Sequence, residues 1–248
     1  MKFNAEEQVE RVVEFIRNYY KDNNLGGVVI GISGGKDSGV VAGLFAKAIG
    51  PENIIGVTLP CHSKNVDSHD AKLVAEKYNF KLVNVDLTNV FDTFENELKK
   101  MDVFEDSEDS KINLKPRLRM ASLYYIAQMY SIINKKPYIV AGTGNKCEKY
   151  VGYFTKGGDG VCDIDVIADF TVEEVIKLGE VLQVPEQVLY KAPSDGLSGK
   201  TDEDKLGFTY ADVAKVMNGG KVKENVRTLI KIKHENNLHK FNIPTYRK

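Results

Sequence analysis

The chain has 248 residues, which suits one large domain. Hydrophobic residues make up 42% of it and charged residues 28%, and the formal net charge of −1 argues against a dedicated nucleic-acid surface. We find no apolar stretch near the ~18 residues of a membrane span, no signal peptide, and no CxxC spacing among the three cysteines. We therefore expect a single domain over 1–248 that works in the cytoplasm without nucleic acid or membrane as partner.

Strand and helix patterns alternate through the first part of the chain. Val9, Val13 and Ile16 recur at helical spacing, and a β-branched run bounded by glycine at 26–33 is typical of a buried parallel strand. The predicted strands are 26–33, 53–60, 81–88 and 137–145, and the predicted helices are 5–20, 38–50, 68–80 and 89–100. This alternation predicts an α/β fold with a doubly wound, mostly parallel sheet and helices on both faces.

Later segments carry weaker signals. The acidic segment 101–115 has no period and is interpreted as a surface loop, with Pro116 in the first turn of a long helix behind it. Residues 181–210 are rich in turn residues and are expected to form a mobile segment over the site. Two closing helices are predicted at 211–218 and 221–237.

The stretch "SGGKDS" at 33–38 follows the first predicted strand directly. Ligands of open parallel sheets bind beyond the carboxyl ends of the strands, and Gly34 and Gly35 would let backbone N–H groups approach an anion there. The helix that follows adds unpaired N–H groups, and Lys36 adds a cation. Asp37 would repel phosphates unless a metal lies between them, so the loop predicts phosphate binding with Mg²⁺.

This loop resembles the pyrophosphate-binding loop, SGGxDS, of the ATP pyrophosphatases, which have the adenine-nucleotide α-hydrolase-like fold and cleave ATP between its α and β phosphates. The loop alone does not choose among members of that superfamily. The segment 142–164, "GTGNKCEKYVGYFTKGGDGVCDI", is similar to the signature of the ammonia-dependent NAD synthetases. Shorter matches at 113–120, 201–210 and 239–244 follow in the family's order, so the resemblance covers almost the whole chain.

The resemblance implies a reaction in which the nicotinate carboxylate of deamido-NAD attacks the α-phosphate of ATP and ammonia then displaces AMP. It implies a homodimer and the following roles. Asp159 is the catalytic residue, a general base beside the ammonia. ATP is bound by Gly31, Ile32, Ser33, Gly34, Gly35, Lys36, Asp37, Ser38, Thr143 and Thr201. Deamido-NAD is bound by Arg117, Lys156, Asp163, His239 and Lys240, and Mg²⁺ by Asp37 and Glu148.

Two alternatives remain open. Another ATP pyrophosphatase, such as a tRNA-thiolating enzyme, would share the loop, although the neutral charge and the cysteines count against it. A non-catalytic nucleotide sensor would share the fold, although it would not need Asp159. Only about 25 residues precede the first strand, so we expect direct use of ammonia rather than a fused glutaminase domain. The chain also departs from the family at Val172, where relatives carry a lysine; Lys191 or Lys200 could replace it.

Overall fold

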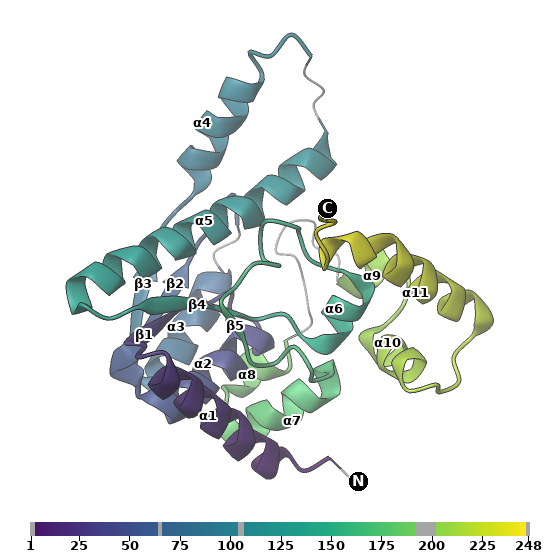
Figure 1. The fold of residues 1–248 in the computed structure, drawn as a ribbon. Helices are drawn as coiled ribbons and strands as arrows, with labels where there is room; N and C mark the ends of the chain where they lie inside the picture. Colours follow the sequence, from purple (N-terminus) through teal and green to yellow (C-terminus); the bar gives the residue numbers. More distant parts are fainter. Residues whose placement is uncertain (1–2, 64–65, 104–106, 192–201, 247–248) are drawn as a thin grey trace.

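The computed structural model describes residues 3–63, 66–103, 107–191 and 202–246. In this part of the chain a parallel sheet of five strands has the order β3-β2-β1-β4-β5 (Figure 1). The strands are β1 (Gly27–Gly31), β2 (Ile54–Thr58), β3 (Lys81–Asn84), β4 (Tyr138–Gly142) and β5 (Ile164–Asp165). Because β1 is central, the winding reverses between β1 and β4, and ligands of such sheets bind at that point.

Helices cover both faces of the sheet, which confirms the predicted fold class. One face is covered by α1 (Ala5–Asp22), α2 (Lys36–Ile49), α3 (Val66–Tyr78), α7 (Val172–Leu182) and α8 (Glu186–Leu189). The other face is covered by α4 (Thr88–Leu98) and α5 (Glu108–Asn134), whose adjoining ends extend away from the sheet (Figure 1). None of the described helices is long and apolar enough to cross a membrane.

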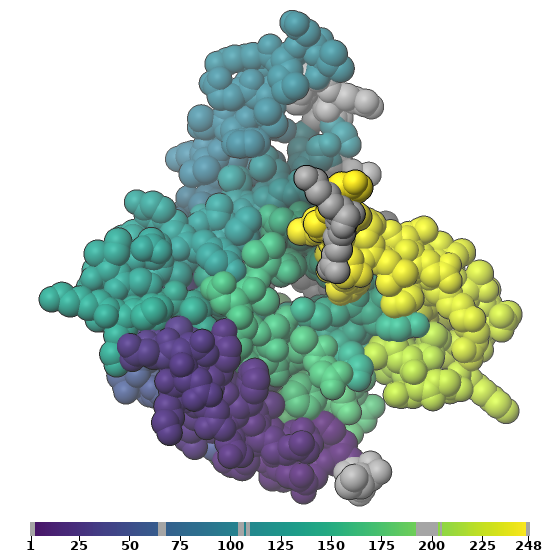
Figure 2. Space-filling view, in the orientation of Figure 1, coloured from purple at the N-terminus to yellow at the C-terminus, as the bar shows by residue number. Residues whose placement is uncertain are grey.

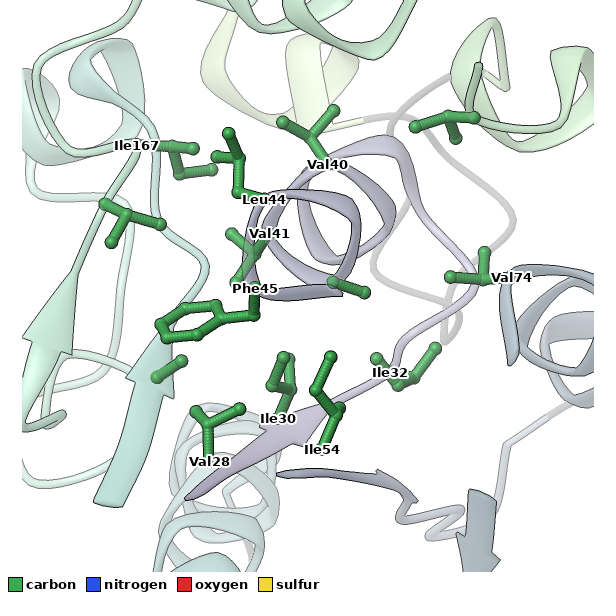
Figure 3. Close-up of a cluster of buried hydrophobic side chains, with 14 of the residues drawn as sticks. Val28, Ile30, Ile32, Val40, Val41, Leu44, Phe45, Ile54, Val74 and Ile167 are labelled. Atoms are coloured by element: carbon green, nitrogen blue, oxygen red, sulfur yellow. The ribbon is translucent and has the colours of Figure 1, made fainter. Parts of the chain in front are cut away.

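The central strand β1 sends side chains to both sides. Val28 and Ile30 pack with Leu44 and Phe45 of α2 in the larger core cluster, which Figure 3 shows, whereas Val29 belongs to the cluster beneath α5. A strand buried on both faces has no position that favours a polar residue, which explains its continuous run of apolar residues.

The C-terminal helices form a lobe with a core of its own. It comprises α6 (Lys146–Val151), α9 (Asp202–Leu206), α10 (Tyr210–Met217), α11 (Glu224–Asn237) and the short η2 (Leu238–Lys240). Cys147 and Val151 of α6 pack there with Val213 and Ile230, apart from both sheet cores. The space-filling view in Figure 2 shows this lobe projecting from one side of the molecule.

The element bounds differ from the sequence predictions in three places. Helix α5 begins at Glu108, so Pro116 lies well inside it and the predicted loop over 101–115 is partly wrong. An acidic, aperiodic segment looks like a loop, but negative charge is also favoured in the first turn of a helix. Helices α6 and α7 and strand β5 were not predicted. The predicted mobile segment contains α8 and α9, and its residues 192–201 lie outside the described part.

We expect Leu44→Ala to lower the free energy of unfolding by about 2–5 kcal/mol, because Leu44 is fully buried between the sheet and the helices on that face. Chemical denaturation monitored by circular dichroism measures this loss. The matched control is Leu229→Ala on α11, where the side chain is 44% exposed and the change should be within about 0.5 kcal/mol. Equal losses in the two variants would contradict the assignment of the core.

Candidate active site

A cavity of about 770 Å³ lies beyond the carboxyl ends of β1, β2 and β4. Residues of α5, α6 and α11 complete its walls, so the sheet and the C-terminal lobe both contribute. The cavity brings together most of the residues predicted from the sequence. Those that line it are Gly31, Ile32, Ser33, Gly34, Gly35, Lys36, Asp37, Thr143, Glu148, Asp159 and Lys240.

The loop at 33–38 connects β1 to α2 and forms one side of the cavity. Gly34 has φ +77°, a value that side chains disfavour, whereas Gly35 has φ −102°, which any residue adopts. Of the two glycines, only Gly34 therefore has backbone angles that a side chain would disfavour. Ser38 is buried, and its hydroxyl donates to the Gly35 carbonyl oxygen at 3.0 Å and contacts Ser33 Oγ at 3.2 Å. Ser38 thus braces the loop.

Asp37 stands at the start of α2 between two polar partners. Its Oδ2 lies 3.0 Å from the ammonium nitrogen of Lys36, which is only 6% exposed. Its Oδ1 accepts a hydrogen bond from Asn145 Nδ2 at 3.3 Å. The carboxylate is thus already neutralised and oriented by neighbours on α2 and at the start of α6.

Glu148 is fixed by the way α6 begins. Asn145 is the N-cap residue, and Glu148 Oε2 accepts the Asn145 backbone N–H at 2.9 Å in a capping box. Asn145 therefore donates hydrogen bonds to both Asp37 and Glu148. Two carboxylates, with the remaining positions filled by phosphate oxygens and water, form a donor set that suits Mg²⁺. The described residues contain no group of three or more His, Cys, Asp or Glu that could hold a metal without such help.

Asp159 lies across the cavity in the turn after the Phe-Thr-Lys run. The Thr155 backbone N–H donates to Asp159 Oδ1 at 2.9 Å. Loss of solvent around the carboxyl raises the pKa of Asp159, against the lowering effect of its backbone hydrogen bonds and of the charges on Lys240 and Arg119. The neighbouring Gly158 is required for close packing, because a Cβ there would lie 3.0 Å from the Pro116 carbonyl carbon.

Lys240 brings the C-terminal end of the chain to the cavity. Its ammonium group donates to the carbonyl oxygens of Gly152 at 2.7 Å and Phe154 at 2.8 Å, and it lies 5.2 Å from the centroid of the Phe154 ring. Desolvation lowers the pKa of Lys240. The predicted ligand His239 does not line the cavity; its carbonyl oxygen accepts from Lys156 Nζ at 3.0 Å.

Arg117 and Lys156 also lie outside the cavity lining, where Arg117 Nε donates to the Lys156 carbonyl oxygen at 3.4 Å. Arg117 follows Pro116 well inside α5, not in the first helical turn that Pro116 predicted, because α5 begins at Glu108. Arg119, two residues on, does line the cavity, and its guanidinium donates to the Leu59 carbonyl oxygen at 3.0 Å. The Arg-x-Arg pattern in the segment 113–120 indicated both arginines as candidates, but it did not predict which one lines the cavity.

Asp163 has structural partners in place. Its Oδ2 accepts the Val140 backbone N–H at 2.8 Å and its Oδ1 accepts the Tyr124 hydroxyl at 3.0 Å, beside β4 and away from the cavity lining. The remaining predicted residue, Thr201, lies outside the described residues. The substrate-binding roles assigned to all these residues stay predictions.

We expect Asp159→Asn to raise the melting temperature at neutral pH. The fold raises the pKa of this carboxyl above its ordinary value of 3.8, so the ionised form is disfavoured in the folded state. Wild-type stability falls as pH rises through the interval between the two values, and the neutral amide avoids that loss. The advantage of the variant should therefore shrink as pH falls toward 4, as thermal denaturation from pH 4 to 8 would measure. An advantage independent of pH would contradict this explanation.

The chain matches known proteins along nearly its whole length. A family model described as NAD synthase matches residues 8–243. The NH(3)-dependent NAD(+) synthetase of Carboxydothermus hydrogenoformans is 38% identical over 98% of both chains. That of Methanocaldococcus jannaschii is 38% identical over 94% of this chain and 87% of its own.

Solved structures agree with the sequence relatives. The structure of NMN synthetase from Francisella tularensis superposes with a TM-score of 0.90 at 32% identity and covers 99% of each chain. The NH3-dependent NAD synthetase from Campylobacter jejuni, in complex with the nitrate ion, has a TM-score of 0.78 at 25% identity and covers 99% of this chain and 100% of its own. The fold, the cavity and these matches lead to one conclusion: this chain belongs to the NAD synthase family.

Proposed function

We propose that this protein is an ammonia-dependent ligase that amidates deamido-NAD to NAD and converts ATP to AMP and pyrophosphate. The observation that carries the proposal is the cavity itself, in a member of the NAD synthase family. Its lining includes the loop at 33–37, the carboxylates of Asp37 and Glu148, and Asp159.

The reaction proceeds in two steps. In the first, a nicotinate carboxylate oxygen attacks the α-phosphorus of ATP, the bond to the bridging oxygen breaks, and pyrophosphate leaves. In the second, ammonia attacks the activated carbonyl carbon, its nitrogen releases one proton to solvent, the bond from the carbon to the AMP oxygen breaks, and AMP leaves as the amide forms. Asp159 is suited to remove a proton from ammonium, because its raised pKa makes the carboxylate a stronger base.

The loop and the acidic residues serve the first step. The N–H groups at the start of α2 and the Lys36 ammonium bind phosphate oxygens, and Thr143 at the end of β4 contacts the nucleotide. Asp37 and Glu148 would hold Mg²⁺. When bound, the metal screens the phosphate charge and stabilises the departing pyrophosphate.

A second substrate is favoured by a specific observation. The solved structure with a TM-score of 0.90 is that of an NMN synthetase, an enzyme named for a mononucleotide product. Four of the five residues expected to bind deamido-NAD lie outside the cavity lining, and only Lys240 is within it. Nicotinate mononucleotide, which lacks the adenylate half of deamido-NAD, is therefore the second candidate substrate.

The deciding assay supplies ATP, Mg²⁺ and an ammonium salt with either deamido-NAD or nicotinate mononucleotide, and measures the amide product, AMP and pyrophosphate. We expect equal yields of the three products and a higher kcat/KM for deamido-NAD. A higher value for the mononucleotide would select the second candidate. Asp37→Ala should lower AMP formation by at least about 100-fold through loss of the metal.

The same assay tests the other readings. Pyrophosphate and AMP formed without amide would indicate an adenylating enzyme with another acceptor, and no ATP consumption would indicate a nucleotide sensor. A thiolating enzyme is disfavoured because Cys61, near the cavity, is buried and burial raises the pKa of its thiol. We also propose that the whole chain is one domain and acts in the cytoplasm, where ATP is supplied.

We propose a homodimer built on α5. Tyr125, Met129, Ile132 and Ile133 recur at helical spacing on one side of this helix and are 71%, 44%, 68% and 66% exposed. A contiguous apolar stripe of this kind is unfavourable in water, and a second copy of the same helix would cover it symmetrically.

Ile132→Glu combined with Ile133→Glu should convert the dimer to a monomer, because the charges would be buried without partners in the interface. Size-exclusion chromatography with light scattering measures the change. A matched control is Leu229→Glu on the exposed side of α11, which should leave the dimer intact. A wild-type protein that is monomeric at high concentration would contradict this proposal.

A further inference from the structure

Asn145 is fully buried at the point where β4 passes into α6, and each polar group of its side chain has a partner. Its Oδ1 accepts the backbone N–H groups of Cys147 at 3.0 Å and Glu148 at 3.1 Å. Its Nδ2 donates to Asp37 Oδ1 at 3.3 Å, across 108 residues of sequence. Its backbone N–H donates to Glu148 Oε2 at 2.9 Å.

The donor half of this side chain is not needed to begin the helix. Capping requires an acceptor, and Thr171 at α7 and Thr209 at α10 complete capping boxes with a hydroxyl. An amide carries an acceptor and two donor hydrogens on one planar group, so Asn145 can cap α6 and also hold a carboxylate on another helix. The bond to Asp37 therefore calls for an explanation beyond helix stability.

The two carboxylates that Asn145 contacts belong to different helices and repel each other when no cation lies between them. Asp37 also has the ammonium group of Lys36, on the same helix, at 3.0 Å from its other oxygen. The amide of Asn145 holds the first oxygen of Asp37, and the backbone N–H of Asn145 holds Oε2 of Glu148. One fully buried residue thereby contacts both members of the pair.

We propose that Asn145 is a positioning residue that sets the Asp37 and Glu148 carboxylates at the spacing needed to share one divalent cation. The inference rests on the proposed use of metal and ATP by this site. Asn145 would not contact the substrates or the cation; it acts through the two acidic residues. Groups that orient metal-binding side chains typically change metal affinity by about 10–100-fold when removed.

The test is Asn145→Ser, which keeps a capping oxygen and removes the amide donor. Mn²⁺ is the probe, with a non-hydrolysable α,β-methylene analogue of ATP, and the electron paramagnetic resonance signal of free Mn²⁺ gives the dissociation constant without turnover. We expect that constant to rise about 10-fold. The Mg²⁺ concentration for half-maximal activity should rise in parallel, with the KM for the nicotinate substrate unchanged.

Thr171→Ala is the matched control, because it removes the hydroxyl cap of α7, which lies away from the cavity lining. It should lower the melting temperature and leave the Mn²⁺ constant unchanged. If the serine variant does not fold, Asn145→Gly replaces it, since glycine is also favoured at N-caps and lacks the donor.

A double-mutant cycle with Asp37→Asn separates positioning from general damage. If Asn145 acts through Asp37, the serine substitution should have much less effect on Mn²⁺ binding in the Asp37→Asn background. An unchanged Mn²⁺ constant in Asn145→Ser, or equal effects in both backgrounds, would overturn the inference. Neither result would affect the proposed function, which fails if the wild-type protein forms no amide.

Discussion

The site depends on the way a parallel sheet brings the carboxyl ends of its strands to one edge. Because β1 is the central strand, the chain leaves it at the middle of that edge, and the loop at 33–38 emerges beside the segment that follows the adjacent parallel strand β4. The loop at 33–38 and the start of α6 are thus neighbours although more than a hundred residues separate them. The packing of helices on both faces keeps this arrangement rigid.

Charge balance is the second constraint at this edge. A buried lysine, Lys36, and two acidic residues occupy a small region where solvent screening is weak, so each requires a partner. The structure meets this requirement in pairs: Lys36 with Asp37, and Glu148 with the backbone N–H of Asn145. Across the cavity, Lys240 is held by carbonyl oxygens near Asp159. The charged side chains of this site are already held in place. A ligand rich in phosphate therefore suits the site.

Local signals predicted β1 to β4 and the loop, and most of the residues that the family resemblance assigned to the site line the cavity. Continuous apolar runs gave β1, β2 and β4, because strands buried on both faces leave a clear pattern. The two-residue β5 and the six-residue α6 are too short to show a period. Helix α7 carries a readable signal, with Thr171 and Glu174 as a capping box before Val175 and Leu178.

The direction in which each side chain points could not be predicted from the sequence. Arg117 and Arg119 lie on one helix, yet only Arg119 lines the cavity, and that outcome depends on how α5 packs on the sheet. Asp163 matches the family signature, but its carboxylate accepts hydrogen bonds from the Val140 N–H and from the Tyr124 hydroxyl. Such contacts join segments that are distant in sequence, so no local spacing reveals them.

The separate core of the C-terminal lobe has a thermodynamic consequence. Glu148 and Lys240 belong to the lobe, whereas the loop at 33–38 belongs to the sheet, so the cavity lies between two cooperative units. Local opening of the lobe with the sheet still folded would remove one wall of the cavity. A ligand that contacts both units couples them, and it raises the free energy of opening of the lobe by the free energy of its own binding. Substrate occupancy and the local stability of the lobe are therefore two measures of the same equilibrium.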